Sequence, residues 1–201
     1  MQTRRSLALP EINKLFKVSL LSLCLLQAGQ LTAQEESQQL HTVLDIESLY
    51  EPVESQDIHG ETAIELLQQL QTKHYASLEI DDNFSALVFD SYLDTLDGAH
   101  LYFMRDDINK LSAYRYTLDD SLKDGSVEPG FEIYNQYYRR VLERLIYAIN
   151  RVENHIPDMD FTIDETILID REEAPYSDTV AQLDDVWRKR VKNSVLSLKL
   201  T

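Results

Sequence analysis

The chain has 201 residues, 43% of them hydrophobic, and carries a net charge of −16. This length predicts one folded domain with appendages, and the hydrophobic fraction excludes a wholly disordered chain. Five glycines and five prolines are few for an all-β fold with many tight turns. The strong negative charge disfavours binding to nucleic acid and to anionic lipid surfaces. The one cysteine, Cys24, leaves the rest of the chain without an internal disulfide or a thiolate metal site.

Residues 1–33 have the pattern of an export signal, with four basic residues against one acid and therefore a net charge of +3. The apolar run Val18–Leu26 has nine residues, which suits the core of a signal peptide and is too short to span a membrane. Cleavage is expected after Ala33, with Ala28 as the alternative. A lipoprotein signal ending at Cys24, a twin-arginine signal and an uncleaved amphipathic helix are weaker alternatives. We expect no stable membrane span after the signal is removed.

Residues 34–60 are rich in Gln, Glu and Ser and are predicted to form a polar, acidic linker or arm. Leu44, Ile46, Leu49 and Tyr50 are the residues in it that could anchor it to the body. The helical domain is predicted to occupy residues 61–201, and its first helix is expected at 61–75 from the spacing of Ile64, Leu67 and Leu70.

The next apolar residues, from Phe84 to Leu96, recur at helical spacing. Asp82 is a candidate N-cap for this helix, and Gly98 suits the position just after its end. A further helix is predicted at 108–122, closed by Gly125. The short connection 126–130 then favours an antiparallel hairpin with the helix that follows.

The longest predicted helix covers residues 131–155 and is expected to organise the domain. Its apolar residues recur at steps of three and four, which places them on one face. They are Phe131, Tyr134, Tyr138, Val141, Leu145, Ala148 and Val152. The charged residues off this stripe, including Arg140, Arg144 and Arg151, are expected to be solvated. The stripe could also serve as a coiled-coil seam, but its aromatic start and its length of little over three heptads favour an internal helix.

Residues 158–176 contain β-prone stretches, but these are short. We therefore expect an ordered extended loop, with at most a small strand. The acids in this loop lack the glycine and spacing of a calcium-binding EF-hand loop. They are Asp158, Asp160, Asp164, Glu165 and Asp170. A final helix is predicted at 178–198, with Trp187 as a packing anchor. Its basic cluster is expected to be solvated or to pair with nearby acids, and it comprises Arg188, Lys189, Arg190 and Lys192.

Several titratable or aromatic residues between positions 74 and 100 invite a functional interpretation. Asp90 and Asp97 are expected to cap helices or to pair with arginine. His74 and His100 are expected to be structural, as are Tyr75 and Tyr92, whose hydroxyls should find hydrogen-bond partners.

An ordered series of short motifs runs through this region. It consists of His74-Tyr75, Asp82, Phe84-Ser85, Phe89-Asp90-Ser91-Tyr92-Leu93, Leu96-Asp97 and the run Leu101 to Asp106. Further matches are Tyr134-Asn135, Arg140, Glu143-Arg144, Tyr147-Ala148, Met159 to Thr162, Asp170-Arg171, Ala174-Pro175, Leu183, Trp187, Val191-Lys192 and Leu196 to Thr201. Over about 140 residues this series closely resembles the N-terminal domain of the tail-specific proteases, also called C-terminal processing peptidases, a bacterial envelope family of serine peptidases.

The resemblance implies a mainly α, non-catalytic scaffold domain of a periplasmic endopeptidase of the Gram-negative envelope, which acts on envelope proteins with apolar C-terminal tails. The implied partners are the PDZ and catalytic domains of the parent protease, an envelope substrate or an adaptor. No stretch resembles the PDZ segment or the serine–lysine dyad of that family. Ser85 and Ser197 have no activating base at an interpretable spacing, so we predict no catalytic residue, cofactor site or metal site. The abrupt end at Thr201 suggests a truncated chain.

Two other functions remain open at this point. The chain could be a free-standing helical binding or adaptor module of the envelope, which would hold a partner on a leftover apolar surface. A metal-dependent hydrolase built from the acids and His74 or His100 is much less favoured.

Overall fold

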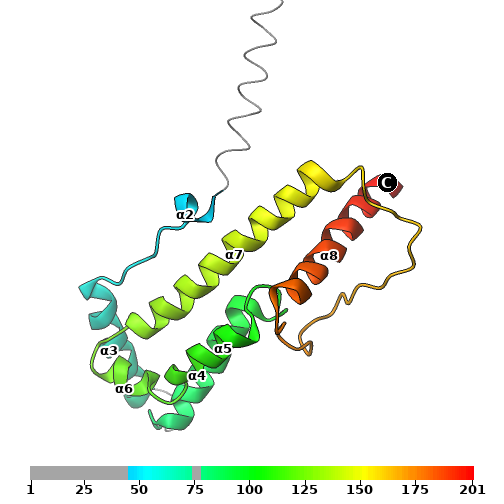
Figure 1. Cartoon of the computed structure of the whole chain (residues 1–201). Helices are drawn as coiled ribbons and strands as arrows, with labels where there is room; N and C mark the ends of the chain where they lie inside the picture. The colour runs from blue at the N-terminus through cyan, green and yellow to red at the C-terminus, as the bar shows by residue number, and fades with distance from the viewer. Residues whose placement is uncertain (1–44, 74–77) are drawn as a thin grey trace, which may run out of the picture. The chain divides into compact units, whose positions relative to one another are not determined.

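The mainly α architecture predicted from the sequence is confirmed by the computed structural model, which describes residues 45–73 and 78–201. The leader, both proposed cleavage positions, Leu44 and the His74-Tyr75 pair lie outside the described residues. Contacts below concern residues 49–201, which form one compact unit. The helices are α2 (Ile46–Leu49), α3 (Asp57–Lys73), α4 (Asp82–Asp97), α5 (Arg105–Leu111), α6 (Leu118–Lys123), α7 (Glu128–His155) and α8 (Val180–Leu200) (Figure 1).

None of the helices in the described part of the chain combines the length and the apolar character needed to cross a bilayer.

The core lies where α4, the turn after it, α5 and the start of α7 meet. Its fully buried aromatic residues are Phe89 in α4 and Phe103 in the turn, and Ile133 of α7 packs against them. The N-cap of α4 is Asp81 and not Asp82 as predicted, because the Asp81 carboxylate accepts a hydrogen bond from the Phe84 amide at 3.0 Å. Gly98 follows the last residue of α4, as predicted.

The single helix predicted at 108–122 is wrong, since the chain forms α5, a 3₁₀ turn at Ser112–Tyr114 and then α6. The free amide of Leu118 donates to the Ser85 hydroxyl at 2.8 Å instead of continuing a helix, and the Asp119 amide shares this acceptor. The polar side chain of Ser85, buried in α4, therefore starts a new helix at Leu118. Contacts of α5 and the 3₁₀ turn with α7 still run in the antiparallel sense expected of a hairpin.

Helix α3 begins at Asp57, four residues earlier than predicted, and packs against α6 through glycine. A Cβ atom added at Gly60 would lie 2.3 Å from the Gly125 carbonyl oxygen, so the two backbones touch. Gly125 closes α6 with φ of 77°, a left-handed conformation that glycine adopts at little cost. The Gly125 prediction is confirmed.

Helix α7 is the longest helix, as predicted, but a different face packs inward. Ile133, Arg144 and Arg151 are separated by 11 and 7 residues and therefore share one side of the helix, and Ile133 and Arg144 are its buried residues. The predicted apolar stripe lies about 100° around the helix from that side. Arg144 is only 7% exposed, which corrects the expectation that it is solvated. The reason is an inward pairing of the α7 arginines with Asp107 and Asp184.

Between α7 and α8 the chain forms turns and extended backbone without a strand in residues 156–179. The isolated β-bridge found among the described residues joins Met104 to Ser177 in the parallel sense, beside and not within the β-prone stretch. Figure 1 shows the segment leaving the end of α7 and returning to the start of α8, and the two helices lie alongside one another.

Candidate functional site

Asp97 organises the turn between α4 and α5. Its carboxylate accepts three backbone hydrogen bonds, from the amides of Leu101, Tyr102 and Phe103 at 2.7, 3.0 and 2.8 Å. Burial raises the pKa of Asp97, whereas the three amide hydrogen bonds oppose that rise because they favour the ionised form. Asp97, predicted to cap a helix or to pair with arginine, instead binds the amides of the turn that precedes α5. The predicted pairing of Asp90 with an arginine is confirmed by a two-point contact with Arg115.

His100 and Arg171 hold the segment before α8 against this turn. The His100 ring lies 3.9 Å from the Tyr176 ring, centre to centre, and its Nδ1 donates to the Ala174 carbonyl. Arg171 is 9% exposed and donates to the carbonyls of Ala99 and His100. Burial, and then the nearby charge of Arg190, lower the pKa of Arg171. The structural role predicted for His100 is confirmed.

Trp187 performs the anchoring role predicted for it. Its indole nitrogen donates to the Leu101 carbonyl at 2.7 Å, and its ring packs near that of Tyr102. The aromatic side chain therefore fixes α8 to the same turn that Asp97 holds from the other side. The Tyr92 hydroxyl likewise finds its expected partner, the Gly130 carbonyl at 3.3 Å.

A buried ion pair links α5 to α7. Asp107, 1% exposed, accepts from the Arg140 guanidinium at 2.8 and 3.0 Å and from the Gln136 amide at 2.7 Å. Burial works to lower the pKa of Arg140, but hydrogen bonds to Asp107 and Glu143 outweigh it and raise that pKa. Every charge in this group has a close partner, as a buried ion pair requires.

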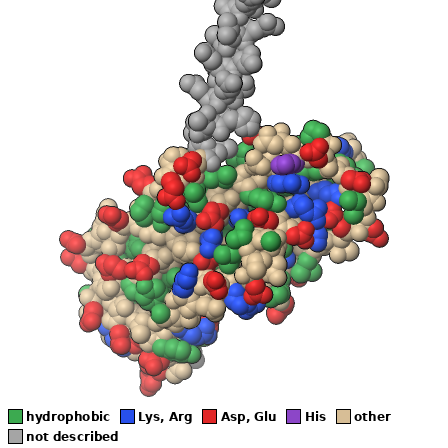
Figure 2. Space-filling view, in the orientation of Figure 1, with side chains coloured by type: hydrophobic (Ala, Val, Ile, Leu, Met, Phe, Trp, Pro, Cys, Tyr) green, Lys and Arg blue, Asp and Glu red, His purple; other side chains and the backbone are tan. Residues whose placement is uncertain are grey.

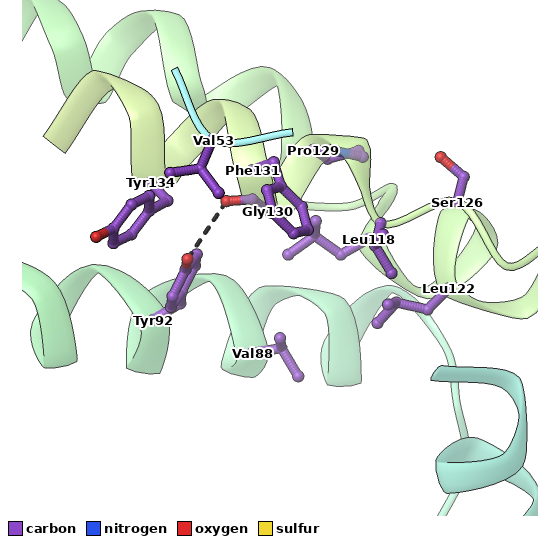
Figure 3. Close-up of a pocket in the computed structure, with 11 residues that line it drawn as sticks. Val53, Val88, Tyr92, Leu118, Leu122, Ser126, Pro129, Gly130, Phe131 and Tyr134 are labelled. Atoms are coloured by element: carbon purple, nitrogen blue, oxygen red, sulfur yellow. Dashed lines mark hydrogen bonds between the residues drawn. The ribbon is translucent and has the colours of Figure 1, made fainter. Parts of the chain in front are cut away.

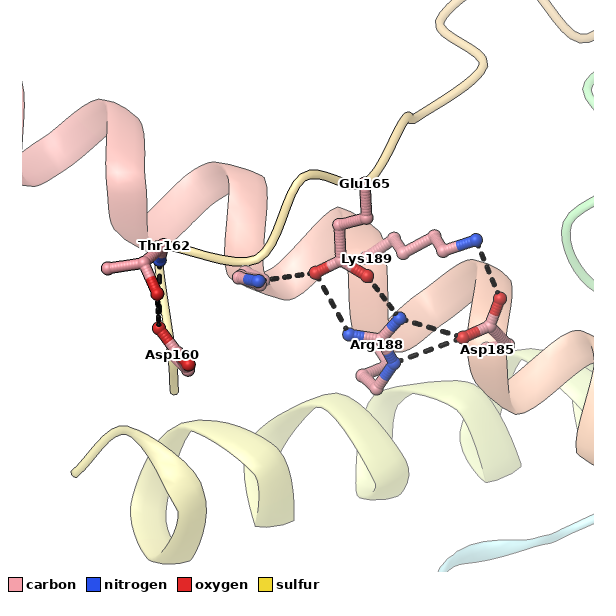
Figure 4. A network of polar contacts seen from close by, with 7 residues as sticks. Asp160, Thr162, Glu165, Asp185, Arg188 and Lys189 are labelled. Atoms are coloured by element: carbon pink, nitrogen blue, oxygen red, sulfur yellow. Dashed lines mark hydrogen bonds and ion pairs between the residues drawn. The ribbon is translucent and has the colours of Figure 1, made fainter. Parts of the chain in front are cut away.

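Three of the four basic residues in the α8 cluster pair with acids, as predicted, whereas Arg190 lies over the Trp187 ring at 6.0 Å. Glu165 accepts from Arg188 at 2.6 and 3.2 Å and also from Lys192, while Asp185 binds Arg188 and Lys189 (Figure 4). Hydrogen bonds from Arg188 and then Lys192 lower the pKa of Glu165 to about 2. The 158–176 segment is therefore tied to α8 by one carboxylate.

This pairing makes stability depend on acidity. Because the folded-state pKa of Glu165 is depressed, its contribution is fully present above pH 4.5 and is lost as pH falls toward 2. We expect Glu165→Gln to melt at a lower temperature than the wild type at pH 7. Between pH 4.5 and 2 its melting temperature should fall less than that of the wild type. Thermal melts over this pH range measure both effects. Glu172→Gln, in the exposed part of the same segment, should follow the wild type, and parallel curves for Glu165→Gln and wild type would contradict the prediction.

The two serines named in the sequence serve the backbone. Ser85 accepts the amides that start α6, and the Ser197 hydroxyl donates to the Asn193 carbonyl one turn earlier in α8. In the ranges 45–73 and 78–201, no group of three or more His, Cys, Asp or Glu side chains is placed to hold a metal ion. Of the loop acids, Glu165 binds Arg188, and Asp160 accepts from the amide and hydroxyl of Thr162.

An apolar groove opens between α4, α6 and the start of α7 (Figure 3). We call it the α4–α6–α7 groove, and six side chains define it: Val53, Val88, Tyr92, Leu122, Phe131 and Tyr134. Its volume of about 480 Å³ falls within the usual range for binding sites. Asn135 forms its rim by exchanging two hydrogen bonds with the backbone of Val53, at 2.8 and 2.9 Å.

The apolar residues of α7 that do not face inward form a second exposed surface, which we call the outer stripe. Tyr134, Leu145 and Val152 lie 11 and 7 residues apart, so they share one side of the helix. They are 36%, 46% and 46% exposed, and Ile149 beside them is 37% exposed. An exposed line of large apolar residues on a long helix is typical of a protein contact surface.

These features define a class of protein: a helical packing domain whose polar side chains mostly hold its own elements together and whose apolar surfaces remain open. A family model described as the tail-specific protease N-terminal domain matches residues 66–201. A Haemophilus influenzae protein named tail-specific protease is 36% identical over 133 residues, which cover 66% of this chain and 19% of that protein. The chain therefore belongs to the tail-specific protease N-terminal domain family, and it spans about a fifth of the length of this curated relative.

Sequence reasoning missed the inward polar contacts. Arg144, which we expected to be solvated, binds Asp184 at 2.5 Å, and Tyr147 on the same side of α7 donates to the Asp184 carbonyl. A usable signal was present in the series Ile133, Arg140, Arg144, Tyr147 and Arg151, which also recurs at helical spacing. Arginines on one line of a helix can pair inward when acids oppose them.

Proposed function

We propose that this chain is the non-catalytic N-terminal scaffold domain of a periplasmic tail-specific serine endopeptidase, which processes or degrades envelope proteins with apolar C-terminal tails. The outer stripe of α7 is the observation that carries the scaffold role, because a domain with Leu145 and Val152 exposed has a surface suited to a further part of the same protein. Family membership supports the protease, and the basic, apolar leader supports export.

Within this proposal the domain holds the PDZ and catalytic parts and does no chemistry. The hydroxyls of Ser85 and Ser197 bind backbone groups, which is not the contact with a base that activates a serine nucleophile. The polar contacts of Asp97, Asp107 and Trp187 join α4, α5, α7 and α8 to one another, as a scaffold requires.

The test compares the purified 201-residue chain with the complete gene product on a peptide with an apolar C-terminal tail. The complete product should cleave the peptide, and the chain alone should not. Serine-dependent cleavage by the chain alone would contradict the non-catalytic role. A complete gene product that ends at Thr201 would instead favour the free-standing binding module, for which the α4–α6–α7 groove is the specific observation.

A further inference from the structure

The α4–α6–α7 groove lies in the acidic part of the domain. Residues 51–130 contain 17 Asp and Glu against 5 Lys and Arg, a net charge of −12, whereas residues 131–201 contain 13 against 10, a net charge of −3. Figure 2 shows acidic side chains gathered over the end formed by α3, α4 and α6, with basic side chains nearer α8. A ligand at the groove therefore meets a strongly negative field.

Several of these acids are sequence neighbours of the residues that line the groove, and the lining itself is mostly apolar. Glu54 follows Val53 in the rim segment, and Asp124 and Glu128 flank the turn from α6 into α7. Glu128 accepts from the Ser126 hydroxyl at 2.7 Å and from the Ser55 hydroxyl at 3.1 Å, which fixes its charge at the edge. The nearby cation Lys123 is already bound to Asp119 at 2.7 Å, so its charge is offset.

The groove has room for large apolar side chains and is already formed. In Figure 3 the Phe131 ring points toward Val88 and Leu122, and the Tyr92 hydrogen bond to Gly130 fixes one wall. Val53 is 43% exposed, so an apolar group entering the groove would cover surface that now faces water. An apolar groove with an acidic rim fits the recognition of an amphipathic segment by anchor residues on one face.

We propose that the α4–α6–α7 groove binds a cationic amphipathic segment of a partner polypeptide, with its apolar side chains in the groove and its Lys or Arg residues at the acidic rim. Anionic lipids and acidic peptides are disfavoured by the same charges. The inference goes beyond the proposed protease function and does not depend on it, since it rests only on the lining of the groove and on the charge around it.

Three synthetic helical peptides of about 18 residues, five turns, test the proposal. They share one leucine pattern and carry Lys, Gln or Glu at every polar position, and fluorescence anisotropy measures their binding to the 201-residue chain. We expect the Lys peptide to bind at least about tenfold more tightly than the Gln peptide, with an affinity that falls as salt rises, and the Glu peptide to bind most weakly. Equal binding of all three, or binding of none, would overturn the proposal.

Two matched variants locate the binding. Val53→Lys puts a cation into the groove, and its backbone contacts with Asn135 do not involve the side chain that changes. Val180→Lys makes the same change at a site that is 51% exposed at the start of α8. Val53→Lys should weaken binding of the Lys peptide at least about tenfold, and Val180→Lys should leave that binding unchanged. Equal effects would place the peptide elsewhere and overturn the proposal, as would sedimentation showing that Val53→Lys abolishes a dimer that fills the groove with a second copy.

Discussion

Replacing Arg140 by methionine should lower the free energy of unfolding by about 3–5 kcal/mol, as expected when one member of a buried ion pair is removed. Asp107 stays 1% exposed and loses both of its guanidinium hydrogen bonds, so a buried carboxylate is left with too few donors. Methionine keeps most of the volume of the side chain, which separates the loss of charge from the creation of a cavity. Urea unfolding followed by circular dichroism measures the difference.

The matched control is Arg105→Met. Arg105 pairs with Asp178 at 2.5 Å, but the two side chains are 49% and 59% exposed. Exposed pairs contribute about 0–1 kcal/mol because water already solvates both charges. If the Arg140 and Arg105 variants lose similar amounts of stability, the Asp107–Arg140 pair does not hold α5 to α7 in the way described here.

Replacing Asp97 by alanine should cost about 3–5 kcal/mol, since three backbone amides lose their acceptor and two of them belong to buried residues. The turn they form carries Phe103 of the core and the carbonyl that binds Trp187, so both packing and the position of α8 depend on it. Asp97→Asn keeps one acceptor oxygen and should cost less, about 1–3 kcal/mol. Thermal and urea unfolding give the order of the variants.

Asp97 also sets a pH dependence. Burial raises the folded-state pKa of Asp97 above 3.8. The protonated side chain therefore stabilises the fold fully below pH 3.8, and this stabilisation is lost as the pH rises through the folded-state pKa. The asparagine variant should lack this change. Asp94→Ala, an exposed position on the same helix, should remain within about 0.5 kcal/mol of the wild type. An Asp97→Ala variant as stable as Asp94→Ala would show that the turn does not need its carboxylate.

The elements that could be predicted are those in which one local pattern dominates. Helices α4, α7 and α8 follow apolar spacing over four or more turns, and Gly125 marks an end that needs φ above zero. Asp90, Trp187 and three of the basic residues of α8 also behave as predicted, since each has a partner of the expected chemical type.

The elements that could not be predicted depend on contacts between distant residues. No local signal shows that Ser85 interrupts the helix expected at 108–122, because its partner, the Leu118 amide, lies 33 residues away. The orientation of α7 depends on Asp107 and Asp184, which draw its arginines inward, so the apolar stripe turns outward. Prediction from apolar spacing assumes that the most apolar face of a helix is buried within the domain. That assumption fails for a helix whose apolar face is available to a partner outside the domain.

The most direct test of the scaffold role is thiol labelling at the outer stripe. Cys24 is the one cysteine of the 201 residues, so in a Cys24→Ser background Leu145→Cys is the only thiol of this chain, at a position that is 46% exposed. Asn150→Cys is the control, because it is exposed and lies five residues on, about 140° around α7. We expect Leu145→Cys to react at least about tenfold more slowly in the complete gene product than in the 201-residue chain, since a group packed against a partner is shielded from reagent, with Asn150→Cys unchanged. Equal rates at Leu145→Cys in the two proteins would contradict the account.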